Sequence, residues 1–171
     1  SPRLPSIAAR GLESLVTDIE VGLSEQARDI RDTAHRFAAE VMRPAGIQLD
    51  QLHDPQDVIK ADSILWDVFK KYREIGLDDV ESATAELSPY ERTQIRALIT
   101  EELGWGDSGL AISLGVANFH KTFAMMSGRP ALIDRFVRGG QDEIGCWAVT
   151  EPDHGSDATW LETTGVRATD G

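Results

Sequence analysis

The sequence contains a single cysteine, Cys146, so it cannot form a disulfide within the chain. No apolar run approaches the length of a membrane-spanning helix, and the first ten residues lack the apolar core of a secretory signal. Positive charge is also scarce, because 17 basic residues stand against 29 acidic ones and give a formal charge of −12. This balance argues against a general nucleic-acid binder and against docking on an anionic membrane. We therefore expect a cytoplasmic protein with neither kind of partner.

Apolar residues recur at steps of three and four along most of the chain, which predicts helices. With 41% hydrophobic residues, 171 residues suffice for one domain or slightly more. The predicted helices cover 12–21, 24–43, 55–75, 88–103, 109–126 and 130–138. Pro44 is expected to end the second helix and Gly76 the third, whereas Ser88–Glu91 forms a capping box that starts the fourth. The apolar stretch 109–126 is expected to be buried on most sides, and the acidic stretch 77–87 to face solvent. The fold class is thus mainly α, an antiparallel helical bundle over 23–141 that follows a tail and short helix at 1–22.

The pattern changes after residue 141. Residues 144–150, IGCWAVT, are β-branched and aromatic and predict a short strand in which Cys146 is a small buried residue. A second short strand is predicted from 163 to 168, before the hairpin-turn signal Asp170-Gly171. We therefore interpret 142–171 as the beginning of a β domain, and expect the chain to be a fragment of a longer protein cut at a turn.

The turn between these two strands, TEPDHGSD at 150–157, combines several groups that could bind a ligand. Pro152 stops strand pairing, and Gly155 allows a positive φ or the close approach of a ligand. Backbone N–H groups around Gly155, with the Ser156 and Thr150 hydroxyls, could form a concavity for an anion such as a cofactor phosphate. The alternative is a polar turn that bonds only to itself. A metal site is also conceivable but matches no calcium-loop spacing, so none is assigned; its ligands would be Glu151, Asp153, His154 and Asp157.

These residues carry a resemblance to the acyl-CoA dehydrogenase family. The family motif, a small-aliphatic-(Ser/Thr)-Glu run followed by Gly-(Ser/Thr)-Asp, is matched in register by Ala148, Val149, Thr150, Glu151, Gly155, Ser156 and Asp157. Upstream, residues 23–44, 69–77 and 99–116 resemble the family's first long helix, its helix ending in Gly-Leu, and its Glu-Glu-Leu segment with the following buried helix. The match covers about residues 20–171. His154 and Trp160 depart from it, since the family prefers small residues there.

The resemblance implies a helical N-terminal domain, then the first strands of a middle β-barrel domain, with FAD as the cofactor. Backbone groups at Trp147 and Val149 and the Thr150 hydroxyl would then bond the pyrimidine side of the flavin. Gly155 and Ser156 would contact the FAD pyrophosphate, and Ser156 would also touch the acyl-CoA substrate. Asp157 would hold the turn.

The reaction implied by the resemblance is α,β-dehydrogenation of an acyl-CoA thioester in fatty acid metabolism. The catalytic base of the family is a glutamate of the C-terminal domain, so no residue of this chain is assigned as the base, and these 171 residues alone are expected to be inactive. Glu101 and Glu102 are possible substitutes, but acids on an amphipathic helix usually form its solvated face. The implied partners are acyl-CoA, an electron-transfer flavoprotein or similar acceptor, and further copies in a homo-oligomer. The alternatives are a flavin-dependent oxidase or monooxygenase of the same fold, and a non-catalytic helical assembly module.

Overall fold

The computed structural model describes residues 22–139 and 143–167. The chain divides into two compact units between Gly115 and Val116, and each unit is described by itself. The predicted helix at 12–21 and the Asp170-Gly171 turn lie outside the described residues. The described residues are mainly helical, as predicted.

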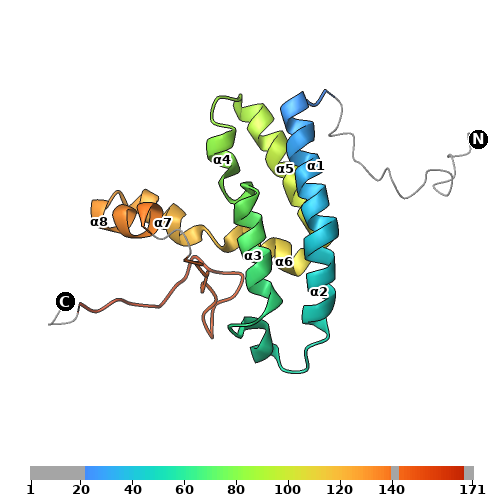
Figure 1. The fold of residues 1–171 in the computed structure, drawn as a ribbon. Coiled ribbons are helices and arrows are strands. Elements are labelled where there is room, and N and C mark those ends of the chain that lie inside the picture. The colour runs from blue at the N-terminus through green and yellow to red at the C-terminus, as the bar shows by residue number, and fades with distance from the viewer. Residues whose placement is uncertain (1–21, 140–142, 168–171) are drawn as a thin grey trace, which may run out of the picture. The chain divides into compact units, whose positions relative to one another are not determined.

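The first unit is built on helices that pack lengthwise against one another (Figure 1). They are α1 (Glu25–Phe37), which runs through a π-helical segment (Ala38–Met42) into α2 (Arg43–Asp50), then α3 (Ile64–Glu74) and α5 (Pro89–Gly106). Short helices connect them: η4 (Pro55–Ile59), η5 (Leu77–Asp79) and α4 (Val80–Ala83). Helix α6 (Ser108–Val116) ends the unit. Helix α1 packs on α5, and α2 packs on α3.

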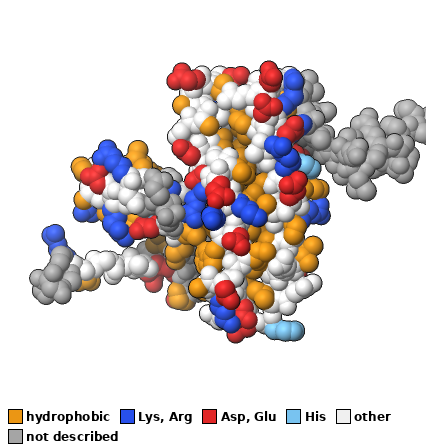
Figure 2. All heavy atoms as spheres, in the orientation of Figure 1, with side chains coloured by type: hydrophobic (Ala, Val, Ile, Leu, Met, Phe, Trp, Pro, Cys, Tyr) orange, Lys and Arg blue, Asp and Glu red, His pale blue; other side chains and the backbone are white. Residues whose placement is uncertain are grey.

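The core of this unit lies between the apolar faces of α1, α3 and α5. Its buried residues include Phe37, Met42, Leu65, Val68, Ile95, Leu98, Ile99 and Leu103. The α5 members recur at the steps of three and four residues that predicted a helix there, and the Ser88–Glu91 capping box is also confirmed. On the outside, acidic and basic side chains are intermixed over the face that Figure 2 shows, with hydrophobic atoms exposed between them.

Helices α1 and α5 run in the same direction, unlike neighbours in a strictly antiparallel bundle. His35 of α1 meets Glu102 of α5, and Ala38, three residues further on, meets Gly106. The two helices approach so closely at the second point that a Cβ on Gly106 would lie 2.8 Å from the Ala38 Cβ. Figure 1 shows the same parallel course, with α3 running the opposite way.

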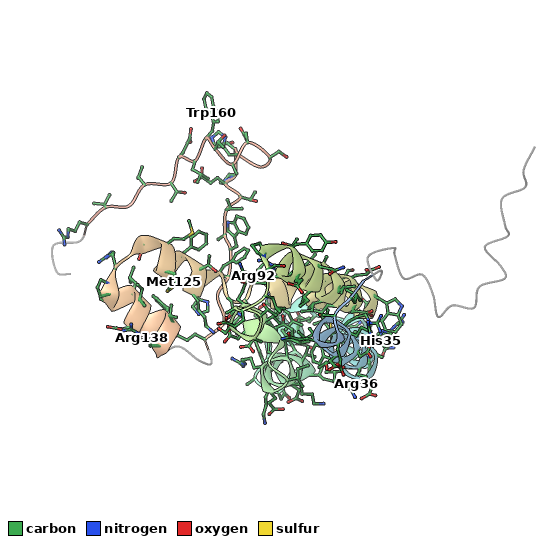
Figure 3. The ribbon with its side chains drawn as sticks, turned by 90° about the horizontal axis from the view of Figure 1, so that it is seen from above. His35, Arg36, Arg92, Met125, Arg138 and Trp160 are labelled. Atoms are coloured by element: carbon green, nitrogen blue, oxygen red, sulfur yellow. The ribbon has the colours of Figure 1, made fainter. Side chains whose placement is uncertain are left out.

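The indole of Trp105, in α5, contacts one residue of α1 and one of α2. The His35 ring stacks on it at 4.8 Å between ring centroids, and the guanidinium carbon of Arg43 lies 4.3 Å from its centroid. His35 Nδ1 also lies 2.7 Å from Glu102 Oε2. Figure 3 shows His35 at the outer edge of this unit, next to Arg36.

The prediction that Pro44 ends a helix is wrong. The helical course continues to Asp50, with Pro44 in the first turn of α2. A proline inside an α-helix removes one N–H and collides with the carbonyl four residues earlier. Here the preceding turn is π-helical, and the Arg43 N–H bonds the Ala38 carbonyl five residues back. We infer that this wider turn accommodates the proline ring without ending the helix.

The predicted helix at 55–75 is interrupted. Asp54 caps the short 3₁₀ helix η4, Lys60 is extended, and Ser63 caps α3 by accepting the Leu65 N–H at 3.2 Å. A second cap inside the periodic stretch therefore starts a new helix. Gly76 ends α3 with a positive φ of 75°, as predicted. In the following acidic stretch, Leu77 is buried and Thr84 is 2% exposed, so this stretch does not simply face solvent.

The second unit contains α7 (Phe119–Ser127), α8 (Pro130–Ile133) and a π-helical turn (Asp134–Arg138), followed by residues 143–167. The predicted single buried helix at 109–126 is wrong in two respects. It is divided between α6 and α7, and Ile112 and Met126 are 69% and 76% exposed. At the division, the Ala117 carbonyl accepts hydrogen bonds from the Gly145 N–H, 28 residues further along the chain, and from His120 Nδ1.

The structure contains no strand within the described residues 143–167. The strand predicted at 144–150 and the described part, 163–167, of the strand predicted at 163–168 lack a ladder. An extended segment becomes a strand only when a partner accepts and donates its backbone hydrogen bonds. Cys146 is exposed, which contradicts its expected burial. The β domain and its boundary after residue 141 therefore stay predictions.

Candidate functional site

The candidate cofactor residues lie in an extended arm of the second unit. Gly145 attaches this arm to the turn before α7 through its N–H, which donates to the Ala117 carbonyl at 2.8 Å. Beyond it, the Trp147 ring packs edge-on against Phe119, with 4.9 Å between centroids, yet the Trp147 residue is 56% exposed. Val149 is half-buried and Thr150 is exposed, so the Thr150 hydroxyl is accessible from outside this unit.

Close packing, and not backbone conformation, requires a glycine at position 145. A Cβ there would lie 2.5 Å from His120 Nδ1 and 3.1 Å from the His120 Cβ and Cγ. The His120 Cβ is bonded directly to the α7 backbone and cannot move aside by side-chain rotation, as the ring atoms could. The arm and α7 therefore meet at a point with no room for a side chain.

Replacing Gly145 with alanine is expected to separate the arm from α7 and to release Trp147 from Phe119. The change would appear as a shifted and sharpened Trp147 indole resonance in an NMR spectrum, with the helix content unchanged. Gly165→Ala is the matched control, because nothing lies within 4 Å of a Cβ at Gly165. An unchanged Trp147 resonance in G145A would contradict this account.

Residues 151–163 form a loop that the Glu151 side chain closes. Its Oε2 accepts the Glu162 N–H at 2.8 Å, and its Oε1 accepts the Thr163 N–H at 2.8 Å as well as the Thr163 hydroxyl. These hydrogen bonds lower the pKa of the Glu151 carboxyl, and the largest effect comes from the Glu162 amide, followed by Thr163. The ionised form of Glu151 is therefore favoured in the folded loop.

Within this loop, His154 lies between two carboxylates. Its Nδ1 is 3.0 Å from Asp157 Oδ2 and its Nε2 is 3.6 Å from Glu162 Oε1, and the side chain is only 15% exposed. The Asp157 carbonyl also accepts the Trp160 N–H at 2.9 Å. Asp157 thus bonds inside the turn, in keeping with its expected holding role. The other departure from the family pattern, Trp160, is 73% exposed and projects from the loop (Figure 3).

Gly155 and Ser156 are both exposed at the tip of this loop. Within the described part of the chain, positive φ angles occur at Gly22, Gly76 and Gly128, so the expected positive φ at Gly155 is absent. A Cβ at Gly155 would meet nothing within 4 Å. Neither the backbone conformation nor the packing of the described residues therefore requires glycine at position 155. That Gly155 lets a ligand approach the main chain stays a prediction.

The described residues bring together no group of three or more His, Cys, Asp or Glu side chains that could hold a metal ion. Nor do they contain a helix of the length and apolarity that crossing a membrane requires. Of the two acids considered as substitute bases, Glu102 is not on a solvated face as expected. Its side chain is 17% exposed and pairs with His35.

Sequence reasoning missed two features. The first is the loop closure by Glu151, whose partners are backbone N–H groups of Glu162 and Thr163 that leave no trace in residue types. The second is a mainly apolar groove of about 460 Å³ in the first unit. Tyr72 lines one side of it, and burial together with the nearby Asp78 raises the pKa of this phenol to about 12. The sequence feature that could have predicted this groove is a set of small residues at helical spacing, Gly104, Ser108 and Ala111.

The candidate site thus consists of an exposed loop tip carrying hydroxyl and backbone donors, held by an internal carboxylate and attached to α7 at Gly145. No protein-family model matches this sequence, and no solved structure matches the chain.

Proposed function

We propose that the chain is part of an FAD-dependent acyl-CoA dehydrogenase that catalyses α,β-dehydrogenation of an acyl-CoA thioester. The observation that carries the proposal is the order of the sequence blocks. Three helical blocks at 23–44, 69–77 and 99–116 precede the motif at 148–157 in the family's register. Several blocks in order are far less probable by chance than a single short motif.

The residues at the loop tip suit a flavin cofactor. Thr150 and Ser156 are exposed hydroxyl donors, and no acceptor among the described residues takes the N–H groups of Gly155, Ser156 or Asp157. Such consecutive backbone donors favour a phosphate group. The open space at Gly155 would let a pyrophosphate approach the main chain.

FAD, when bound, would supply a hydride acceptor for the β-carbon of the substrate. The Thr150 hydroxyl and backbone groups of Trp147 and Val149 would bond the pyrimidine side of the ring, where hydrogen bonds stabilise negative charge. Gly155 and Ser156 would hold the pyrophosphate, and Ser156 would also contact the acyl-CoA. The α-proton would go to a glutamate of a C-terminal domain, so none of these residues acts as the base. An electron-transfer flavoprotein and a homo-oligomeric assembly belong to the same proposal.

The test is a visible absorption spectrum of the full-length gene product, before and after anaerobic addition of mixed acyl-CoAs. We expect oxidised-flavin bands that bleach on addition. Bands that persist would favour an oxidase or monooxygenase over a dehydrogenase, and a colourless protein that cannot be reconstituted with FAD would exclude the cofactor site.

The hydroxyl at position 150 offers a residue-level test in the same protein. We expect Thr150→Val to lower flavin retention and slow bleaching, because it removes a donor and changes little volume. Thr159→Val is the matched control, since Thr159 is an exposed hydroxyl in the same loop that has no expected role. Equal behaviour of the two variants would remove Thr150 from the proposed site.

A further inference from the structure

Glu151 holds both flanks of the candidate loop. Its carboxylate reaches across eleven and twelve residues to the main chain at Glu162 and Thr163. Its own backbone exchanges a pair of hydrogen bonds with His154, at 3.0 Å from the Glu151 N–H and 3.2 Å to the Glu151 carbonyl. Hydrogen bonds to an ionised acceptor are stronger than neutral ones. One residue thus joins the start, the middle and the end of the loop.

The loop has little else to define its shape. Most of its residues are exposed, including Pro152, Gly155, Ser156 and Leu161, so burial of apolar surface contributes little to its order. A segment with few buried contacts opens easily unless hydrogen bonds hold it. The His154 ring adds two contacts, at 3.0 Å from its Nδ1 to Asp157 Oδ2 inside the loop and at 3.6 Å from its Nε2 to Glu162 Oε1. The contact that reaches the end of the loop is thus longer than either backbone hydrogen bond to Glu151.

We propose that Glu151 is a positioning residue, whose ionised carboxylate closes the 151–163 loop and thereby sets the geometry of the Gly155–Asp157 turn. The role requires a carboxylate at this position, because both oxygens act as acceptors. The ligand of the turn rests on the proposed function and would be FAD. The closure itself does not depend on that function.

The closure has a defined pH dependence. The donated hydrogen bonds lower the folded-state pKa of Glu151 below its ordinary value of 4.5. The stabilisation is therefore complete above that ordinary value, and is lost as the pH falls through the lowered pKa. The other ionisable side chains of the loop, Asp153, His154, Asp157 and Glu162, are all retained in Glu151→Gln. An acid transition caused by any of them would therefore persist in that variant.

The first experiment follows hydrogen exchange of the Glu162 and Thr163 amides by NMR in the 171-residue chain. In Glu151→Gln we expect both amides to exchange about tenfold faster or more, because a glutamine side chain offers one acceptor oxygen in place of two. Asp153→Asn is the control, since it removes the same charge from an exposed position two residues away. We also expect the acid-dependent shift of these amides to disappear in Glu151→Gln only. Unchanged exchange, or an unchanged acid transition, in Glu151→Gln would overturn the proposal.

The second experiment measures flavin retention in the full-length gene product, which separates the two proposals. Retention that falls in Glu151→Gln but not in Asp153→Asn would support positioning of the cofactor turn. Equal retention in both variants, despite faster exchange in Glu151→Gln, would overturn the positioning of a flavin site. If the unmodified protein bound no flavin while the exchange results held, the proposed function would fail and the loop closure would stand.

Discussion

Replacing Gly106 with alanine is expected to destabilise the helical unit by about 1–3 kcal/mol, the range for overpacking a close contact. The added Cβ would lie 2.8 Å from the Cβ, 3.0 Å from the Cα and 3.2 Å from the carbonyl oxygen of Ala38. Ala38 is fully buried, and two of these three atoms belong to the backbone, so no side-chain rotation can relieve the contact. The α1–α5 crossing would have to widen, at the point where the π-helical segment brings α1 against α5.

The measurement is the free energy of unfolding from denaturant titration followed by circular dichroism. The matched control is Gly104→Ala in the same helix, where nothing lies within 4 Å of an added Cβ. Because alanine is a better helix former than glycine by about 1 kcal/mol, G104A should be as stable as the unmodified chain or more so. Opposite signs for the two variants would establish the crossing, whereas a stabilising G106A would contradict it.

Replacing Ile95 with alanine is expected to cost about 2–5 kcal/mol, the range for emptying a fully buried isoleucine site. Ile95 is 1% exposed and belongs to the α5 face that packs into the core. The loss combines the removed apolar burial with the cavity that the surrounding helices fill only in part. An effect of this size is a large share of the total stability of a small domain.

The same substitution at Ile112 provides the control for Ile95. Ile112 is 69% exposed in α6, so Ile112→Ala should change the free energy of unfolding by less than about 0.5 kcal/mol. Comparable losses at the two positions would mean that the core is not where this structure places it. A large loss at Ile112 alone would indicate that another surface covers α6 in solution.

Helix faces and caps could be predicted from the sequence because they depend on residues close together in the chain. The buried positions of α5, the Ser88–Glu91 capping box and the Gly76 helix end all follow from local spacing or backbone preference. The same local rules failed at Pro44, where the outcome depends on a π-helical turn that no residue pattern announces.

The candidate site could also be predicted from the sequence only in part. The sequence pointed to the turn at 150–157 because hydroxyls, glycine and proline concentrate there. It could not show that Glu151 reaches the main chain at Glu162 and Thr163, because backbone donors have no residue identity. It also predicted a β ladder at 144–150, whereas the Gly145 N–H of that segment bonds the Ala117 carbonyl, in the turn between α6 and α7.

The sequence by itself determined that the described residues are mainly helical, which face of α5 is apolar, and where several helices begin and end. It also located the turn at 150–157 in which hydroxyl, carboxylate, glycine and proline residues concentrate. These properties arise from periodicity and from the conformational preferences of single residues. Only the tertiary structure decided that α1 and α5 run parallel and touch at Gly106, that 109–126 divides at Ala117, and that one carboxylate closes the loop. Each of these depends on atoms that are distant in sequence and meet only when the backbone is folded.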